Sequence, residues 1–367
     1  MTVIFSVAIT SYFYKIYAIM KNKLHNPQSR RRFIGTAASL VAGVAAAPSL
    51  IAAPNIIRRY NKPDSLIKDV QIGVITYSFR SLPDQSAEAT LKYVREAGIS
   101  AIELMGDPAE SFAGKPESPV DRRAMYRLWR AERSGDELTE DQQKELADLR
   151  AQMDAYNKEV AAWRNQVSMD KFEQVRKMYN DAGVSIYAFK PNAFGQDNSD
   201  AEINYGMQAA KALGASHVTL EHPSDDAHTR RLGKLAKKNK VYVGYHGHEQ
   251  QTPTFWDTAL DQSKYNAMNL DIGHYVAAGN PDPLDLIRAK HEHIMSMHVK
   301  DRQTPTNGKA NLVWGQGDTP ISEVLQLMSN QKYNFPATIE LEYEVPQNSD
   351  AVKEVAKCLE YCRKALV

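Results

Sequence analysis

From about residue 70, the chain repeats one pattern: a short apolar run rich in β-branched and aromatic residues, followed by a helical stretch. Such alternation is typical of βα units, in which helices cover the parallel strands that they connect. The apolar runs fall at 71–79, 101–105, 185–192, 217–223, 241–248, 268–275, 294–301 and 337–344. Eight strands of this kind predict an α/β protein with a closed (β/α)8 TIM barrel over residues 70–367.

Glycines mark the ends of three expected helices. The segments REAGIS, NDAGVS and KALGAS place Gly98, Gly183 and Gly214 just before a strand. Glycine adopts the left-handed conformation that closes a helix, so each segment predicts a helix stop. Their similarity indicates successive copies of one βα unit.

Residues 108–170 are too many for an ordinary connection between the second and third strands. Their charged sequence, rich in Ala, Leu, Gln and Glu, predicts a helical hairpin inserted after strand 2. We expect its turn at Ser134-Gly135-Asp136 and a capping box between Thr139 and Gln142. One interpretation is an enlarged connection packed outside the barrel. The other is a lid or an oligomer contact near the active-site rim, so the sequence allows a homo-oligomer.

The first 53 residues read as an N-terminal extension with an export signal, and 54–69 as a linker. Residues 29–35 (SRRRFIG) precede a mild apolar run that extends to residue 53, and this layout resembles a twin-arginine export signal. We therefore expect an exported, periplasmic protein that meets a membrane only through an uncleaved signal. The apolar segment before Met20 is either upstream of the true start or a genuine anchor.

The charge balance points to a small molecule as the partner. The chain has 45 basic and 44 acidic residues, a formal net charge of +1. It lacks the basic field that supplies most nucleic-acid affinity, so we expect no nucleic-acid partner. The two cysteines, Cys358 and Cys362, are four residues apart in an expected helix, which predicts small core residues rather than a disulfide.

Polar residues close each of the last four expected strands. Active sites of such barrels lie at the carboxyl ends of the strands, where a charged side chain is costly unless it is paired or bound to a metal. The residues at these ends are His246 and His248, Asp271 and His274, His298 and Lys300, and Glu340, Glu342 and Glu344. Because side chains alternate along a strand, His246 and His248 share a face, as do the three glutamates. Four neighbouring strands thus direct ligand-type side chains to one rim.

This mixture of imidazole and carboxylate groups without thiolates predicts a divalent metal. Mn²⁺ is our first expectation, with Zn²⁺, Co²⁺ or Fe²⁺ as alternatives, rather than a closed structural zinc site. The other histidines considered, His222, His228, His291 and His293, fall in loop or helix contexts, and we expect them at the surface.

The strand-end motifs His-x-His, Leu-Asp-x-x-His, His-x-Lys-Asp and Ile-Glu resemble the xylose-isomerase-like TIM-barrel superfamily of sugar phosphate isomerases and epimerases. They stand at 245–248, 270–274, 298–301 and 339–340, and the resemblance covers roughly residues 70–365. It implies one metal ligand from each of strands five to eight. Carried over, these are Asp271, His298 and Glu340, with Glu342 as the alternative for the last.

Strand five departs from the epimerase pattern, which has a glutamate ligand there. This chain offers His246, and Glu221 at the end of strand four is the alternative source of a carboxylate. The change puts in doubt a symmetric scheme with a carboxylate on each side of the substrate. We expect Glu340 or His248 to act as the base, His274 as an acid, base or extra ligand, and Lys300 to neutralise charge on oxygen.

Four further residues are candidates for contact with the substrate: Glu221, Tyr77, Trp314 and Glu103. Trp314 begins a Trp-Gly-Gln-Gly-Asp-Thr-Pro loop, and we hypothesise that it stacks on a sugar. The alternative is a glycine turn followed by a helix cap at Asp318 or Thr319.

Together these features favour a metal-dependent sugar isomerase or epimerase that acts through an enediolate on a carbohydrate. A lyase or hydratase on a 3-keto sugar or glycoside is the first alternative. A non-catalytic sugar-binding or partner subunit is the second. An endonuclease IV-like role is disfavoured by the neutral charge and by the absence of histidine ligands on strands two and three.

Overall fold

A computed structural model describes residues 62–367 of the chain. The expected export signal and most of the expected linker lie outside the described residues. Within residues 62–367, no helix combines the length and the apolar character needed to cross a membrane.

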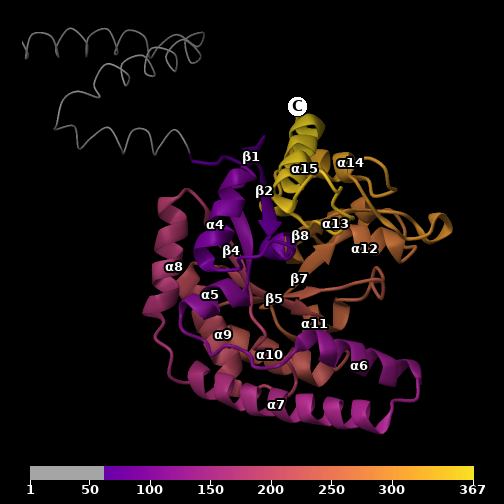
Figure 1. Ribbon diagram of the computed structural model, residues 1–367. Coiled ribbons are helices and arrows are strands. Elements are labelled where there is room, and N and C mark those ends of the chain that lie inside the picture. The colour runs from indigo at the N-terminus through magenta and orange to yellow at the C-terminus, as the bar shows by residue number, and fades with distance from the viewer. Residues whose placement is uncertain (1–61) are drawn as a thin grey trace, which may run out of the picture. The chain divides into compact units, whose positions relative to one another are not determined.

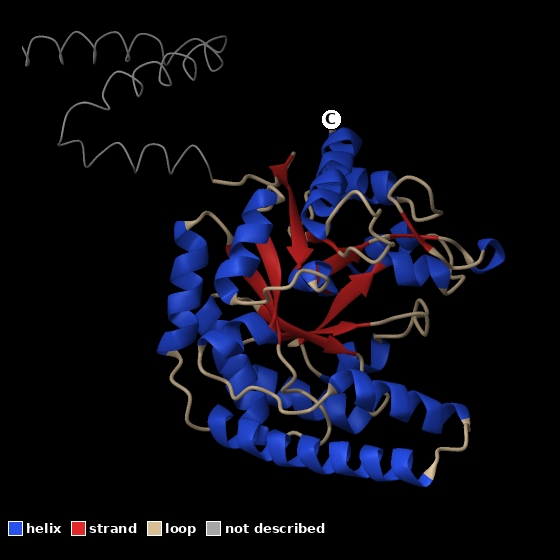
Figure 2. Cartoon of the chain, in the orientation of Figure 1, coloured by secondary structure: helices blue, strands red, loops and turns tan. Residues whose placement is uncertain are grey.

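Eight parallel strands form a closed barrel. Their order is β2, β11, β8, β7, β6, β5, β4 and β3, and a pairing between β2 and β3 closes the ring. Figure 2 shows these strands in red, surrounded by helices in blue. The bounds are β2 Val70–Ile75, β3 Ala101–Met105, β4 Ser185–Lys190, β5 His217–Glu221, β6 Tyr242–His246, β7 Asn266–Asp271, β8 Ile294–Val299 and β11 Ala337–Ile339. The predicted (β/α)8 barrel is confirmed, although most strands end earlier than the sequence suggested.

Helices cover the outside of the barrel (Figure 1). The helices that connect the strands bury apolar side chains against them, as alternating βα units require. They are α4 Ala87–Glu96, α5 Gly106–Phe112, α8 Asp170–Asp181, α9 Asp200–Leu213, α10 Asp226–Asn239, α11 Asp257–Gln262, α12 Ile272–Ala277, α13 Pro283–Lys290, α14 Ile321–Gln331 and α15 Ala351–Leu366. Gly98, Gly183 and Gly214 have φ of 82°, 84° and 83°, the left-handed conformation expected of helix stops. Cys358 and Cys362 are free and buried in α15.

Two helices between β3 and β4 lie along one another, α6 (Arg122–Ser134) and α7 (Glu140–Arg164). Gly135 ends α6 with φ 81°, and Thr139 forms a capping box with Gln142 at the start of α7. The pair has a small apolar cluster of its own around Leu128, which is separate from the main core. The lower part of Figure 1 shows α6 and α7 in magenta.

A short hairpin precedes the first barrel strand. β1 (Leu66–Ile67) pairs antiparallel with β2, and Lys68 and Asp69 at the turn have φ of 44° and 67°. Two consecutive positive φ angles give the tight turn that matches the twist of paired strands. The end of the segment that we expected to be a linker is thus part of the barrel unit.

Candidate functional site

Four side chains converge at the carboxyl ends of neighbouring strands. His246 ends β6, Asp271 ends β7, His298 lies near the end of β8, and Glu340 follows β11. One nitrogen or oxygen atom from each lies within 4.8 Å of the others, and all four residues are buried. Since parallel strands end at a common rim, residues 94 positions apart in sequence (246 to 340) meet there. We call these four residues the ligand cluster.

Asn269 sets the orientation of His246. Its side-chain nitrogen donates to Ser296 Oγ at 2.7 Å and to Glu103 Oε2 at 3.3 Å, so its Oδ1 must accept. Oδ1 lies 2.7 Å from His246 Nδ1, which therefore carries the proton. The Nε2 lone pair of His246 is left free on the side of Asp271, whose Oδ2 is 4.0 Å away. Burial holds the pKa of His246 well below its usual value, so the ring is neutral, as a metal ligand must be.

Glu103 sets the orientation of His298 in the same way. His298 Nε2 lies 2.8 Å from Glu103 Oε2, and Thr219 donates to Oε1 of the same carboxylate at 2.6 Å. The Nδ1 atom of His298 is directed to the cluster, 2.9 Å from Glu340 Oε2 and 3.9 Å from Asp271 Oδ2. A carboxylate behind a histidine is the usual support of a metal-binding imidazole.

The two carboxylate oxygens of Asp271 differ in their hydrogen bonds. Oδ1 accepts the backbone N–H of His274 at 2.7 Å and so caps α12. Oδ2 is buried and accepts no well-aligned hydrogen bond within the described chain, although Lys300 Nζ is 3.0 Å away. A buried carboxylate oxygen without a hydrogen bond is costly, so the position favours an added cation.

Lys300 contacts three carboxylates. Its Nζ lies 2.6 Å from Glu340 Oε2, 2.7 Å from Glu342 Oε2 and 3.0 Å from Asp271 Oδ2. Burial alone would lower the pKa of Lys300, but the three carboxylates outweigh it and raise the pKa. Burial acts to raise the pKa of Glu340, yet Lys300 and His298 hold it well below its usual value. Lys300 and Glu340 are therefore both charged, whereas burial raises the pKa of Asp271.

Negative charge exceeds positive charge around the cluster. Glu103, Glu221, Asp271, Glu340 and Glu342 supply five carboxyl groups, against the two ammonium groups of Lys190 and Lys300. In response, the pKa of His298 rises to about 10, because Glu103 and Glu340 outweigh the effect of burial. A divalent ion would take over this charge from the imidazolium. Two oriented imidazoles, the Asp271 oxygen that accepts no well-aligned hydrogen bond and the excess of carboxylates all fit a divalent metal.

On one side of the cluster, Arg302 orients His274. Its Nη1 lies 2.6 Å from His274 Nδ1, and since arginine can only donate, Nδ1 accepts. The proton of His274 is then on Nε2, which faces Glu342 Oε2 at 3.9 Å. Burial, together with Lys300, lowers the pKa of His274 to about 2, so the ring is a neutral donor.

On another side, Glu221 lies between Lys190 and His248 at the rim. Its Oε1 is 2.9 Å from Lys190 Nζ and its Oε2 is 3.5 Å from His248 Nε2. The His248 ring lies 5.0 Å from that of His246 and 4.6 Å from that of His274, with about half of its side chain exposed. Glu221 is not a member of the ligand cluster, and it stands at the outer rim beside His248.

The structure corrects several expectations for individual residues. Glu103 is fully buried and its oxygens are taken by protein donors, so it supports His298 and does not face a substrate. Trp314 packs in the core against Tyr361 and presents no open stacking face. Tyr77 does lie on the rim, in the 3-10 turn Thr76–Phe79 that follows β2, with 39% of its surface exposed.

The glycine loop after β8 is held by Asp301. Asp301 Oδ2 accepts the backbone N–H groups of Gly315, Gln316 and Gly317 at 2.7–3.1 Å. This close approach leaves no room for a Cβ atom at Gly317. The expected helix cap at Asp318 or Thr319 is wrong, because Pro320 occupies the N-cap of α14 and makes no side-chain cap.

Two histidines that we expected at the surface are not there. His228 is buried and bonded to the carbonyl of Phe194, and His222 is partly buried between the rings of Tyr245 and Phe255. The residues that the sequence analysis missed are Asn269, Lys190 and Arg302. Of these, only Asn269 could have been identified from the sequence, because it precedes Asp271 by two positions and so lies on the same face of β7.

Fold and site together define a (β/α)8-barrel protein whose polar cluster stands where such barrels carry their active sites. The model of the xylose isomerase-like TIM barrel family matches residues 91–362. The chain belongs to the xylose isomerase-like TIM barrel family.

Solved structures share this fold at low sequence identity. A sugar phosphate isomerase/epimerase from Parabacteroides distasonis ATCC 8503 is 16% identical, with a TM-score of 0.51, over 82% of this chain and 96% of that one. A probable 3-DHS dehydratase from Bacillus anthracis, involved in petrobactin synthesis, is 14% identical, with a TM-score of 0.52, over 79% and 97%. An L-ribulose 3-epimerase is 12% identical, with a TM-score of 0.51, over 81% and 95%. No curated protein matches the chain.

Proposed function

We propose that this chain is a divalent-metal-dependent isomerase or epimerase that moves a proton beside the carbonyl group of a carbohydrate, through an enediolate. The observation that carries the proposal is the ligand cluster, in which one ring nitrogen of His246 faces Asp271 and one of His298 faces Glu340. Membership of the family and the epimerase among its structural neighbours support a sugar as the substrate class.

His246, Asp271, His298 and Glu340 would hold the metal, Mn²⁺ in the first place and Zn²⁺, Co²⁺ or Fe²⁺ as alternatives. When bound, such an ion polarises a carbonyl oxygen and makes the hydrogen on the neighbouring carbon more acidic. The remaining steps fall to side chains of the rim.

Side chains that can act as base and as acid stand in and beside the cluster. Glu340, kept ionised by Lys300, or His248 at the exposed rim takes the proton from carbon. His274 presents its Nε2 proton for the substrate oxygen, because Arg302 holds the other nitrogen. Lys300 places a positive charge beside the developing oxyanion.

A lyase or hydratase on a keto sugar or glycoside is the second candidate, and a specific observation favours it. His246 is a neutral imidazole where an epimerase of the resembled type has a carboxylate. With a neutral group on that side, a proton removed by Glu340 is not readily returned from the opposite face of the sugar. Loss of a β-oxygen protonated by His274 or His248 is the natural alternative outcome.

Proton exchange tests the proposal. The full chain is loaded with Mn²⁺ and incubated in deuterated water with a panel of ketopentoses, ketohexoses and keto glycosides, and the sugars are followed by NMR and mass spectrometry. We expect exchange of one carbon-bound proton, lost at least about 100-fold in Glu340→Gln. Glu344→Gln is the matched control, because Glu344 is exposed four residues further along and should retain the rate of the natural chain.

The products separate the candidates. Exchange that retains water and aglycone supports the isomerase or epimerase, whereas their release supports the lyase. A metal-loaded chain that exchanges no proton with any sugar contradicts both enzymes and favours a non-catalytic sugar-binding subunit.

We also propose, from the sequence alone, that the chain is exported to the periplasm. The test is cell fractionation of the natural chain beside the double variant Arg30→Lys, Arg31→Lys. The variant should stay in the cytoplasm, and equal partition of the two chains would contradict export through this signal.

A further inference from the structure

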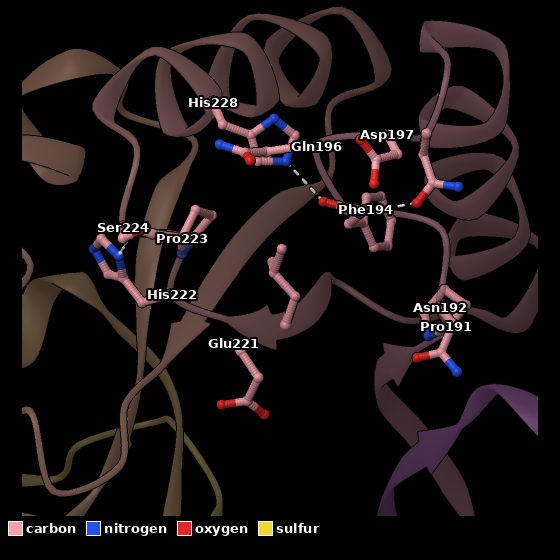
Figure 3. A pocket seen from close by; sticks show the side chains of 13 residues that line it. Pro191, Asn192, Phe194, Gln196, Asp197, Glu221, His222, Pro223, Ser224 and His228 are labelled. Carbon is pink, nitrogen blue, oxygen red and sulfur yellow. Dashed lines mark hydrogen bonds between the residues drawn. The ribbon is translucent and has the colours of Figure 1, made fainter. Parts of the chain in front are cut away.

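A hollow lies on the same rim as the ligand cluster. Its volume is about 520 Å³, within the ~300–1,000 Å³ typical of small-molecule pockets. Figure 3 shows the segment from Glu221 to Ser224 on one side and residues of the segment 191–197 on the other. It is lined by Pro191, Asn192, Phe194, Gly195, Gln196, Asp197, Asn198, Leu220, Glu221, His222, Pro223, Ser224 and His228. None of the four cluster residues lines it, so it is a separate site.

Glu221 joins this hollow to the ligand cluster. It lines the hollow, and its Oε2 lies 3.5 Å from Nε2 of His248, whose ring is 5.0 Å from the ring of His246. A ligand that fills both places therefore passes Glu221 and His248. If one part of a substrate occupied the ligand cluster and another part the hollow, the bond between the two parts would lie beside Glu221 and His248.

The lining of the hollow selects against anions. It contains the carboxylates of Glu221 and Asp197 and, among the described residues that line it, no lysine or arginine. A phosphate or carboxylate group would meet like charge there, because Lys190, the cation beside Glu221, does not line the hollow and is already paired with Glu221 at 2.9 Å. Carboxylates and amides are instead good partners for neutral hydroxyl groups.

Several polar side chains of the hollow are free to bind. Asn192, Asp197 and Ser224 are exposed, and their side chains make no hydrogen bond within residues 62–367. Leu220 and Pro223 add apolar surface beside these groups. A polar edge next to an apolar face matches a sugar ring, which presents hydroxyl groups at its rim and C–H bonds on its faces.

We propose that this hollow binds a second, neutral sugar ring, so that the substrate is a glycoside of at least two rings rather than a monosaccharide phosphate. The inference rests on the proposed function, in which the first ring occupies the ligand cluster. It deepens that function by naming the substrate class: the bond between the rings lies beside Glu221 and His248.

Binding tests this independently of turnover. The full chain with Mn²⁺ is titrated by calorimetry with glucose, glucose 6-phosphate, cellobiose, maltose and lactose. We expect at least one disaccharide to bind about 10-fold or more tightly than glucose, and glucose 6-phosphate to bind no more tightly than glucose. Ser224→Trp, which fills the hollow, should abolish the advantage of the disaccharide and leave glucose binding unchanged. Ser134→Trp, at the exposed end of α6, is the matched control and should bind all five sugars as the natural chain does.

Three results of these titrations would overturn the inference. Tighter binding of glucose 6-phosphate than of every disaccharide would overturn the inference, as would full disaccharide affinity in Ser224→Trp. Equal affinity of glucose and all three disaccharides would also overturn it. Proton exchange at the sugar is scored in a separate assay, so a chain that binds disaccharides without exchange fails the proposed function but still has the binding site for a second sugar ring.

Discussion

Replacing Glu103 by glutamine removes the negative charge behind His298 and keeps the shape of the side chain. The amide oxygen can still accept from His298 Nε2 and Asn269 Nδ2, now 2.8 and 3.3 Å from Glu103 Oε2. The amide nitrogen can donate to Thr219 Oγ1, which lies 2.6 Å from Oε1. The variant therefore isolates the effect of charge on the imidazole that faces the ligand cluster.

The size of the effect follows from the lost charge. A hydrogen bond to an ionised partner contributes about 1.5–3 kcal/mol and a neutral one about 0.5–1.5 kcal/mol, so the difference is about 1–1.5 kcal/mol. That corresponds to a roughly 10-fold weaker metal affinity, at the lower end of the ~10–100-fold typical of residues that support metal ligands.

The assay is a competition titration of Mn²⁺ between the full chain and a coloured chelator. Glu103→Gln should bind Mn²⁺ about 10-fold more weakly than the natural chain. Glu110→Gln is the matched control, because Glu110 is also buried but contacts Tyr205 and Lys115, away from the cluster. Unchanged affinity in Glu103→Gln, or an equal loss in Glu110→Gln, would refute the reasoning.

Three further outcomes are expected. Asp271→Asn keeps the oxygen that caps α12 but loses the negative charge. Metal affinity in the same titration should therefore fall at least about 10-fold, with little change in melting temperature. A large drop in melting temperature would contradict the assignment of one Asp271 oxygen to the cap and the other to the metal. Burial lowers the pKa of His217 to about 4, below the value of about 6.5 in the unfolded chain. Neutral His217 therefore stabilises the fold above pH 6.5. This contribution, up to about 3 kcal/mol, is lost as the pH falls from about 6.5 to about 4. In urea unfolding, His217→Gln should lose less stability between pH 7 and 4 than the exposed control His293→Gln, and equal losses would count against it. Thr139→Ala removes the capping box and should destabilise the α6–α7 hairpin by about 1 kcal/mol. Amide hydrogen exchange should then become faster in residues 122–164 alone. Faster exchange throughout the barrel would contradict a local role of the cap.

The sequence was sufficient to predict the barrel and to bring candidate ligands from its last four strands to one rim, but it left His246 and Glu221 as alternatives for one position and Glu340 and Glu342 for another. Strand periodicity and the common rim of parallel strands place His246, Asp271, His298 and Glu340 together without any knowledge of their partners. His246 joins the cluster, whereas Glu221 and His248 lie outside it on the rim. The geometry thus favours His246 as the fourth ligand.

The supporting residues could not be predicted, because they depend on contacts across the barrel. Glu103 meets His298 from 195 positions away, and its strand gives no sign of which partner it will have. Trp314 was expected to be an open stacking face, yet the loop that carries it folds onto Asp301 and directs the indole into the core. Local patterns determine which face a side chain occupies, whereas its partners follow from the packing of the whole barrel.

The most direct test of the central claim is an anomalous difference map from crystals of the chain grown with Mn²⁺. We predict one strong peak per chain, bonded to His246 Nε2, His298 Nδ1, Asp271 and Glu340. No peak at this position, or a peak held by other residues, would contradict the account.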